Sequence, residues 1–120
     1  MPLVWVFVGG GLGALSRYGL TLLMNQWLGQ SFPYGTLSAN LLGCLVFGVI
    51  VGVIDAGFDL SSSMRLLLLT GFLGALTTFS TFEYELFTFS KEGFALKALL
   101  YLVVSVVIGY SLLWGGFSLA

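Results

Sequence analysis

The polar stretch "GFLGALTTFSTFEYE", residues 71–85, lies within a chain that is 58% hydrophobic. Its first glycines, Gly71 and Gly74, each lower helix propensity by about 1 kcal/mol relative to alanine. The hydroxyl side chains that follow can bond backbone groups freed where a helix breaks; they are Thr77, Thr78, Ser80 and Thr81. A helix broken at mid-membrane exposes carbonyl oxygens, and these suit a hard cation such as sodium. The stretch therefore predicts a functional site rather than a simple anchor.

Two phenylalanines of this stretch, Phe79 and Phe82, stand at positions i and i+3. Such pairs are usually packing residues, but the edge of an aromatic ring is electropositive and attracts a small anion. A conducting site must bind an ion well enough to admit it and weakly enough to release it. Thr78, Thr81 and Glu85 form a second stripe, whose hydroxyls could replace lost hydration. The carboxylate of Glu85 does not suit an anion path, and its role is left open.

Two further polar faces accompany this stretch. In "GTLSANLLG", Thr36, Asn40 and Gly43 fall at i, i+4 and i+7, on one side of a helix. A hydrogen bond between helices is the simplest account of the amide, and donation to a passing ion is the alternative. The other face, near the C-terminus, comprises Tyr101, Ser105 and Gly109. Packing is its default role, and lining a polar path is the sharper alternative.

Arg17, in "GGGLGALSRYG", is the only charged residue of its apolar segment. Its guanidinium could snorkel to an interface, hold helices together through carbonyl hydrogen bonds, or supply positive potential to an anion. A structural role for Arg17, by snorkelling or by holding helices together, is favoured over an electrostatic role towards an anion. Gly9 and Gly13 precede it at the GxxxG spacing that permits close packing of membrane helices.

Composition excludes several classes of protein. Only 8% of the residues are charged, whereas soluble domains have about a quarter, so the solvent of this chain is lipid. A net charge of -1 argues against nucleic-acid binding, and the absence of histidine argues against a transition-metal site. A single cysteine, Cys44, allows no intrachain disulfide. Without a nucleophile pair or a phosphate-binding loop, the chain is not expected to be an enzyme.

Four apolar segments are long enough to cross a bilayer, which needs about 20 residues per helix. They cover residues of about 3–28, 34–54, 63–90 and 94–117. The sequence thus predicts an all-α membrane protein, with residues 1–120 forming a single four-helix transmembrane domain whose third helix is broken near mid-membrane. The connecting loops are short, so neighbouring helices are antiparallel and both termini lie on one side.

The distribution of basic residues specifies orientation only weakly. Cytoplasmic loops normally carry an excess of Lys and Arg. Here Arg65 lies on the side of the termini, and Lys91 and Lys97 lie on the other side. A difference this small permits insertion in both orientations, which would allow an antiparallel homodimer.

Three motifs, "GGGLGALSRY", "GTLSANLLG" and "GFLGALTTFSTFEYE", together resemble the Fluc, or CrcB, bacterial fluoride channels. The resemblance extends over essentially the whole chain. It implies a fluoride-selective passive channel in the bacterial inner membrane that exports cytoplasmic fluoride. It also implies a dual-topology antiparallel homodimer, with two pores along the dimer interface that are each built from both subunits.

The same resemblance implies roles for individual residues. Phe79 and Phe82 match the phenylalanines whose ring edges contact fluoride, and Asn40 matches a pore asparagine that donates a hydrogen bond. Ser80 and Thr81 match a polar track that passes fluoride along.

The resemblance also implies roles for residues at the end of the pore and at the centre of the dimer. Glu85 matches a carboxylate near the end of the track, and Gly74 and Thr77 match positions whose carbonyls hold one central, structural sodium ion. Arg17 matches the basic residue of the first motif, in a structural or electrostatic role. Gly109 departs from the hydroxyl residue expected at its position. The remaining polar positions near the pore are Thr36, Tyr101 and Ser105.

Two other functions compete with a channel. A small, dimeric, dual-topology, proton-coupled multidrug-type exporter needs a carboxylate deep in its first span, but the only charged residue of that span is Arg17. A non-transporting subunit is the third possibility, and the polar third span counts against it. Fluoride flux without a proton gradient would identify the channel, and proton-dependent cation export would identify the exporter.

Overall fold

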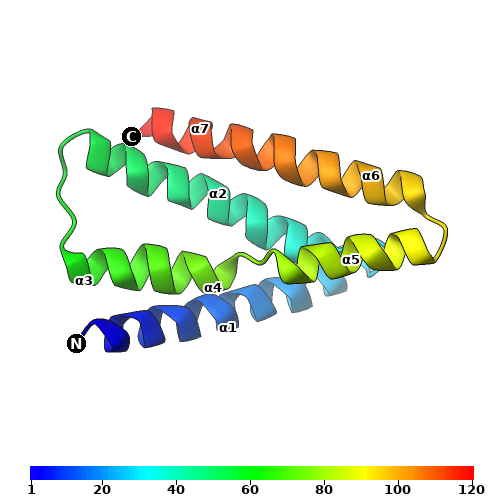
Figure 1. The fold of residues 1–120 in the computed structure, drawn as a ribbon, viewed down its shortest axis with the longest axis horizontal. Coiled ribbons are helices and arrows are strands. Elements are labelled where there is room, and N and C mark those ends of the chain that lie inside the picture. The colour runs from blue at the N-terminus through cyan, green and yellow to red at the C-terminus, as the bar shows by residue number, and fades with distance from the viewer.

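The computed structural model describes all 120 residues, and every regular element in it is helical (Figure 1). The first two spans are α1 (Pro2–Leu28) and α2 (Tyr34–Asp55). The third span consists of α3 (Ser62–Arg65), η1 (Leu66–Leu73), α4 (Gly74–Leu76) and α5 (Ser80–Lys91). The fourth consists of α6 (Ala95–Val103), η2 (Val104–Ile108) and α7 (Gly109–Leu119), where η denotes a π-helix. Both termini lie at the same end of the molecule (Figure 1).

All four spans are long and apolar enough to cross a membrane. The molecule is 48 Å along its longest axis, which matches the thickness of a bilayer with its headgroup regions. The predicted all-α membrane fold with four spans is therefore confirmed, and the chain is a multi-pass membrane protein. The helix bounds lie close to those expected from the sequence.

Glycine ends three of the helical spans. Gly29, Gly57 and Gly93 adopt φ values of 80°, 106° and 85°, a left-handed conformation that residues with a Cβ rarely adopt. Each follows the last turn of a span, so the chain reverses within a few residues. These tight turns hold neighbouring spans antiparallel.

Glycine also sets the distance between α1 and the third span. A Cβ added at Gly9 would overlap the backbone carbonyl of Leu67, and one added at Gly13 would overlap that of Phe72. Membrane helices gain little from hydrophobic burial in lipid, so close backbone contact of this kind is a main source of their association. The GxxxG pair of the first motif therefore packs α1 directly against η1.

A second glycine contact joins α2 to α7. A Cβ at Gly48 would overlap the carbonyl of Leu113, and one at Gly116 would overlap that of Leu45. The contact is reciprocal, because each helix places a glycine under a carbonyl of the other.

Few residues are buried within one chain. Only 16 of 120 residues are buried, so most of the apolar surface faces lipid or another protein. The buried hydrophobic residues are Ala39, Leu73, Leu76, Phe82, Ala98 and Tyr101. Three of them lie on the third span, one on α2 and two on α6, and Leu20 of α1 packs against the cluster formed by Ala39, Leu73 and Leu76.

The third span breaks later than the glycines alone would place it. The helix continues through Gly71 and Gly74 to Leu76, and the chain becomes extended at Thr77, with φ −86° and ψ 154°. Gly71 instead provides close contact with α1, where an added Cβ would lie 2.9 Å from the carbonyl oxygen of Val6. The predicted break is therefore present, but it lies beyond both glycines, and Gly71 has a packing role within the π-helical stretch η1.

The adjacent pair Gly115 and Gly116 tests the glycine packing. An alanine at Gly116 must push α7 away from α2, whereas a Cβ at Gly115 meets nothing within 4 Å. We expect Gly116→Ala to cost about 1–3 kcal/mol, as overpacking does, and Gly115→Ala to be neutral or slightly stabilising. Thermal unfolding of the two variants in detergent measures the difference. Equal midpoints for both would show that the α2–α7 contact tolerates a methyl group.

Candidate functional site

Asn40 holds the break of the third span through both the oxygen and the nitrogen of its side-chain amide. Its Oδ1 accepts a hydrogen bond from the backbone N–H of Thr78 at 2.8 Å, and its Nδ2 donates to the carbonyl of the same residue at 3.1 Å. These bonds replace the helical partners that an extended residue loses. One turn along α2, a Cβ at Gly43 would overlap the methyl group of Thr77. The polar face of α2 therefore meets the broken segment directly.

The side chains of the break satisfy other backbone groups. Thr78 Oγ1 accepts a hydrogen bond from the N–H of Thr81 at 3.3 Å, at the start of α5. Thr77 Oγ1 donates to the carbonyl of Leu73 at 2.8 Å, as hydroxyls within helices often do. The carbonyl oxygen of Thr77 itself accepts no hydrogen bond. This oxygen at the break is thus left without a protein donor.

Arg17 approaches the break from α1. Its Nε donates a hydrogen bond to the carbonyl of Ala75 at 3.0 Å, one residue before α4 ends at Leu76. An orphan carbonyl at a helix end needs a donor when it lies at membrane depth. Arg17 supplies that donor, which is the structural role considered for it from the sequence.

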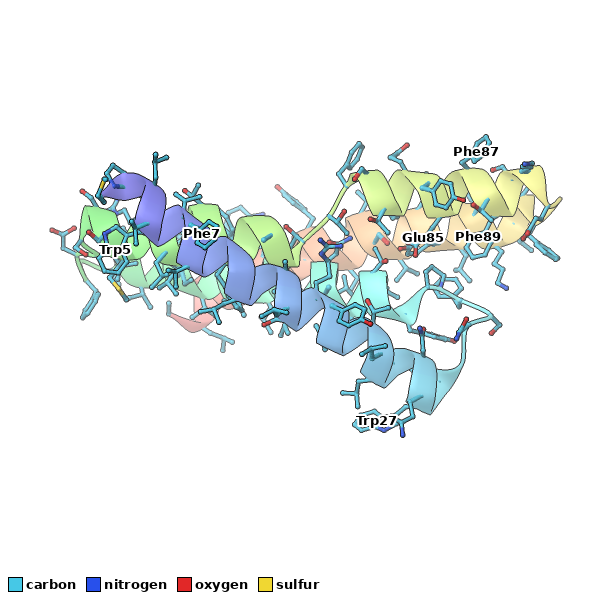
Figure 2. All side chains as sticks on the ribbon, turned by 90° about the horizontal axis from the view of Figure 1, so that it is seen from below. Trp5, Phe7, Trp27, Glu85, Phe87 and Phe89 are labelled. Atoms are coloured by element: carbon cyan, nitrogen blue, oxygen red, sulfur yellow. The ribbon has the colours of Figure 1, made fainter.

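Glu85 joins three spans through its carboxylate. Thr36 Oγ1 donates to Oε2 at 3.1 Å, and the hydroxyl of Tyr101 donates to Oε1 at 2.9 Å. Thr36 and Tyr101 are buried. In Figure 2, Glu85 lies on the side of α5 that faces the other spans and Phe87 on the opposite side. Each hydroxyl has one hydrogen, so both are directed at the carboxylate.

The two phenylalanines of the polar stretch have different surroundings. Phe82 is 6% exposed and meets Tyr101 edge to face, with ring centroids 4.9 Å apart and planes at 78°. Phe79 is 74% exposed, and its centroid lies 6.4 Å from that of Phe82. One ring is thus fixed by the chain's own core, and the other projects from it.

A groove of about 590 Å³ runs beside the break. We call it the groove; its lining includes Asn40, Gly43, Cys44, Gly74, Thr77, Thr78, Phe79, Phe82 and Ser105. Ser105 Oγ is buried and makes no hydrogen bond, and no other buried side-chain atom of the chain lacks a partner. Buried polar groups are nearly always satisfied, so the groove holds an unused hydroxyl. A Cβ at Gly109 would lie 3.3 Å from Cys44 Sγ, so that glycine provides contact rather than a donor.

A smaller pocket of about 300 Å³ opens where α1 ends and α2 begins. We call it the mouth pocket; its lining includes Thr36, Glu85 and Phe89. Thr36, Glu85 and Tyr101 form what we call the carboxylate network. Its members Thr36 and Glu85 border this pocket, whereas Phe79 and Phe82 border the groove.

The structure brings together most of the residues singled out in the sequence, but not all. Three predicted pore residues line neither pocket within one chain: Ser80, Thr81 and Tyr101. Ser80 is exposed at the first residue of α5, and Thr81 is half-buried. Arg17 also lines neither pocket, because its guanidinium is directed at Ala75.

Sequence reasoning missed two features of the site. The first is that Thr36 and Tyr101 share the carboxylate of Glu85 as their acceptor. The second is the place of Cys44 in the groove. A polar residue at membrane depth signals that a partner exists, but its identity depends on how the spans pack.

Comparison with known proteins supports a single family. A family model described as CrcB-like protein, Camphor Resistance (CrcB), matches residues 4–117. The fluoride-specific ion channel FluC of Acidobacterium capsulatum is 45% identical over 97% of this chain and 93% of its own length. Proteins of the same name from Nitratidesulfovibrio vulgaris and Pyrococcus abyssi are 44% and 41% identical, over 97% and 96% of this chain and 94% and 92% of their own. These relatives are named as ion channels, in agreement with the prediction that the chain is not an enzyme.

Asn40 is the residue whose loss should loosen the break. In Asn40→Ala the backbone N–H and carbonyl of Thr78 lose their partners, which costs about 1–3 kcal/mol. We expect a lower unfolding midpoint in detergent and faster hydrogen exchange in peptides covering residues 77–79. Ser38→Ala is the matched control, because Ser38 Oγ bonds only to Gly35 within the same helix. Unchanged exchange in Asn40→Ala would mean that the break holds its shape without the amide.

Proposed function

The chain belongs to the CrcB family, and from this premise we propose that it is a passive, fluoride-selective channel that exports fluoride from the cytoplasm. The resemblance carried by the three sequence motifs is confirmed by the match over residues 4–117. Relatives that share more than 40% of their residues with this chain are named fluoride-specific ion channels.

The observation that carries the proposal is the composition of the groove. Phe79 and Phe82 border it beside the unpaired hydroxyl of Ser105. Ring edges and a hydroxyl hydrogen are both electropositive, and neither carries a full charge. Such a set attracts an anion without trapping it, as conduction requires.

Fluoride is small, so the loss of its hydration must be offset by many donors in series. Moving an ion into a low dielectric costs on the order of 20 kcal/mol before compensation. Asn40 has one Nδ2 hydrogen left after it donates to Thr78, and Ser105 has its hydroxyl hydrogen. In this proposal Ser80 and Thr81 continue the track of hydroxyls. Glu85 lies towards the end of the track and orients Thr36 and Tyr101.

The channel is proposed to be an antiparallel homodimer with two pores. Phe79 is 74% exposed, and Glu83, one turn beyond it, is an exposed carboxylate without an ion pair. A charged group facing lipid is costly, so this surface suits cover by protein or water. The weak bias of basic residues is compatible with insertion in both orientations. A second copy against the groove would enclose the exposed ring.

A structural sodium ion on the dimer axis is part of the same proposal. The carbonyl oxygen of Thr77 accepts no hydrogen bond, and Thr77 and Gly74 border the same groove. Unwound carbonyls of this kind are the usual ligands of sodium in membrane proteins. The ion would add fixed positive charge where the two broken spans cross.

Fluoride efflux from liposomes tests the function. We expect purified protein to release fluoride rapidly without a proton gradient, with no release of chloride. In Phe82→Ile the electropositive ring edge is lost, so the rate should fall to that of empty vesicles. Phe87→Ile is the matched control, because Phe87 lies on the opposite side of α5 from Glu85 (Figure 2).

Three outcomes of this assay would contradict the proposal. Well-folded protein that releases no fluoride would remove the function. Cation export that depends on a proton gradient would favour the exporter instead. A Phe82→Ile variant as active as the wild type would place the pore elsewhere.

Removal of sodium tests the ion proposed at Gly74 and Thr77. Protein purified and reconstituted with N-methylglucamine in place of sodium should lose fluoride flux, because the break loses the charge that holds its carbonyls. Returning sodium to the same vesicles should restore the flux, which controls for damage during purification. Full flux in the absence of sodium would refute this assignment.

A further inference from the structure

Lys97 is a cation held in a fixed place. Its side chain is half-buried, with Nζ lying 5.1 Å from the ring centroid of Phe89 and 5.5 Å from that of Phe94. It makes neither an ion pair nor a hydrogen bond. Two aromatic rings attract the ammonium group and restrict its motion, yet no carboxylate neutralises it. Its positive charge therefore acts on its surroundings.

Phe89 connects this charge to the mouth pocket. Phe89 lines the pocket together with Glu85, one turn before it on α5 (Figure 2). Its ring also meets Tyr101 edge to face, with centroids 6.3 Å apart and planes at 77°. Lys97 thus lies behind one wall of the pocket, a single ring away from the carboxylate network.

The position of Lys97 in its helix is electrostatically unfavourable. It is the third residue of α6, which begins at Ala95 and has no acidic residue in its first turn. A helix N-terminus carries partial positive charge, so a basic residue there is disfavoured and an acidic one is preferred. Attraction to the rings of Phe89 and Phe94 offsets part of this cost, but it leaves the charge without a counter-ion. The positive charge is therefore available to act on a nearby anion.

No other basic side chain is held in a fixed place beside this pocket. Arg65 pairs with Asp59 at 3.4 Å, near the opposite end of the third span. Arg17 donates to a backbone carbonyl beside the break. Lys91, the last residue of α5, is exposed and lies over no ring. Lys97 is the one cation fixed beside the mouth pocket.

We propose that Lys97 steers anions into the mouth pocket. A fixed positive charge raises the local concentration of anions and so their rate of entry, an effect that salt screens. One unit charge about 10 Å away through water changes that concentration about twofold. The inference rests on the proposed channel function and adds the residue that sets anion capture at this mouth.

The test compares Lys97→Gln with the wild type in vesicles of uncharged phosphatidylcholine. Initial fluoride efflux is measured at low fluoride, in about 10 mM and about 1 M sodium gluconate, where the screening length falls from about 30 Å to 3 Å. We expect Lys97→Gln to be about twofold slower at low salt and equal to the wild type at high salt. Lys97→Arg, which keeps the charge, is the matched control and should keep the wild-type rate.

Each other result overturns the proposal in a recognisable way. Equal rates for Lys97→Gln and the wild type at low salt would show that the charge has no effect on entry. A deficit of the same size at both salt concentrations would assign Lys97 a purely structural role. A wild-type rate that is independent of salt would refute steering even if the glutamine variant did not fold. Wild-type protein without any flux would instead refute the channel function on which this inference rests.

Discussion

The two hydrogen bonds between the Asn40 amide and the Thr78 backbone are the interaction on which the rest of the site depends. A helix can be interrupted at membrane depth only if other protein groups satisfy its freed N–H and carbonyl groups. The amide of Asn40 carries both an acceptor oxygen and N–H donors, so it can bond the N–H and the carbonyl of one residue together. With the backbone of Thr78 fixed, the chain can turn Phe79 outward and restart α5 with Phe82 facing the core.

The carboxylate of Glu85 has a comparable organising effect at the other end of the site. By accepting hydrogen bonds from Thr36 and Tyr101, it fixes where two hydroxyl groups point and ties the second, third and fourth spans together. Hydroxyls that donate to a carboxylate are not free to donate elsewhere. The unused donor capacity therefore lies at Ser105 and Asn40, on the groove side of the phenylalanine pair.

Much of this arrangement could be predicted from the sequence, because the bilayer imposes strong rules. Segment length alone predicts the four spans, and the polar motifs point to Asn40 and to the stretch around Phe79. The position of the break could not be predicted from Gly71 and Gly74, because Gly71 instead packs against α1. Nor could the acceptor of Arg17 be read from one span, since it is a carbonyl 58 residues away. Local propensity indicates that a helix is weak, and the packing of other spans decides where it ends.

The glycine contacts have a thermodynamic consequence. Only 16 of 120 residues are buried within the chain, and the spans meet through backbone atoms at positions such as Gly9 and Gly116. The heat-capacity change of unfolding arises mainly from apolar surface that becomes exposed to water. Spans that separate but remain in lipid expose little of it. Their association free energy should therefore vary almost linearly with temperature, without the pronounced maximum and cold denaturation of a water-soluble domain.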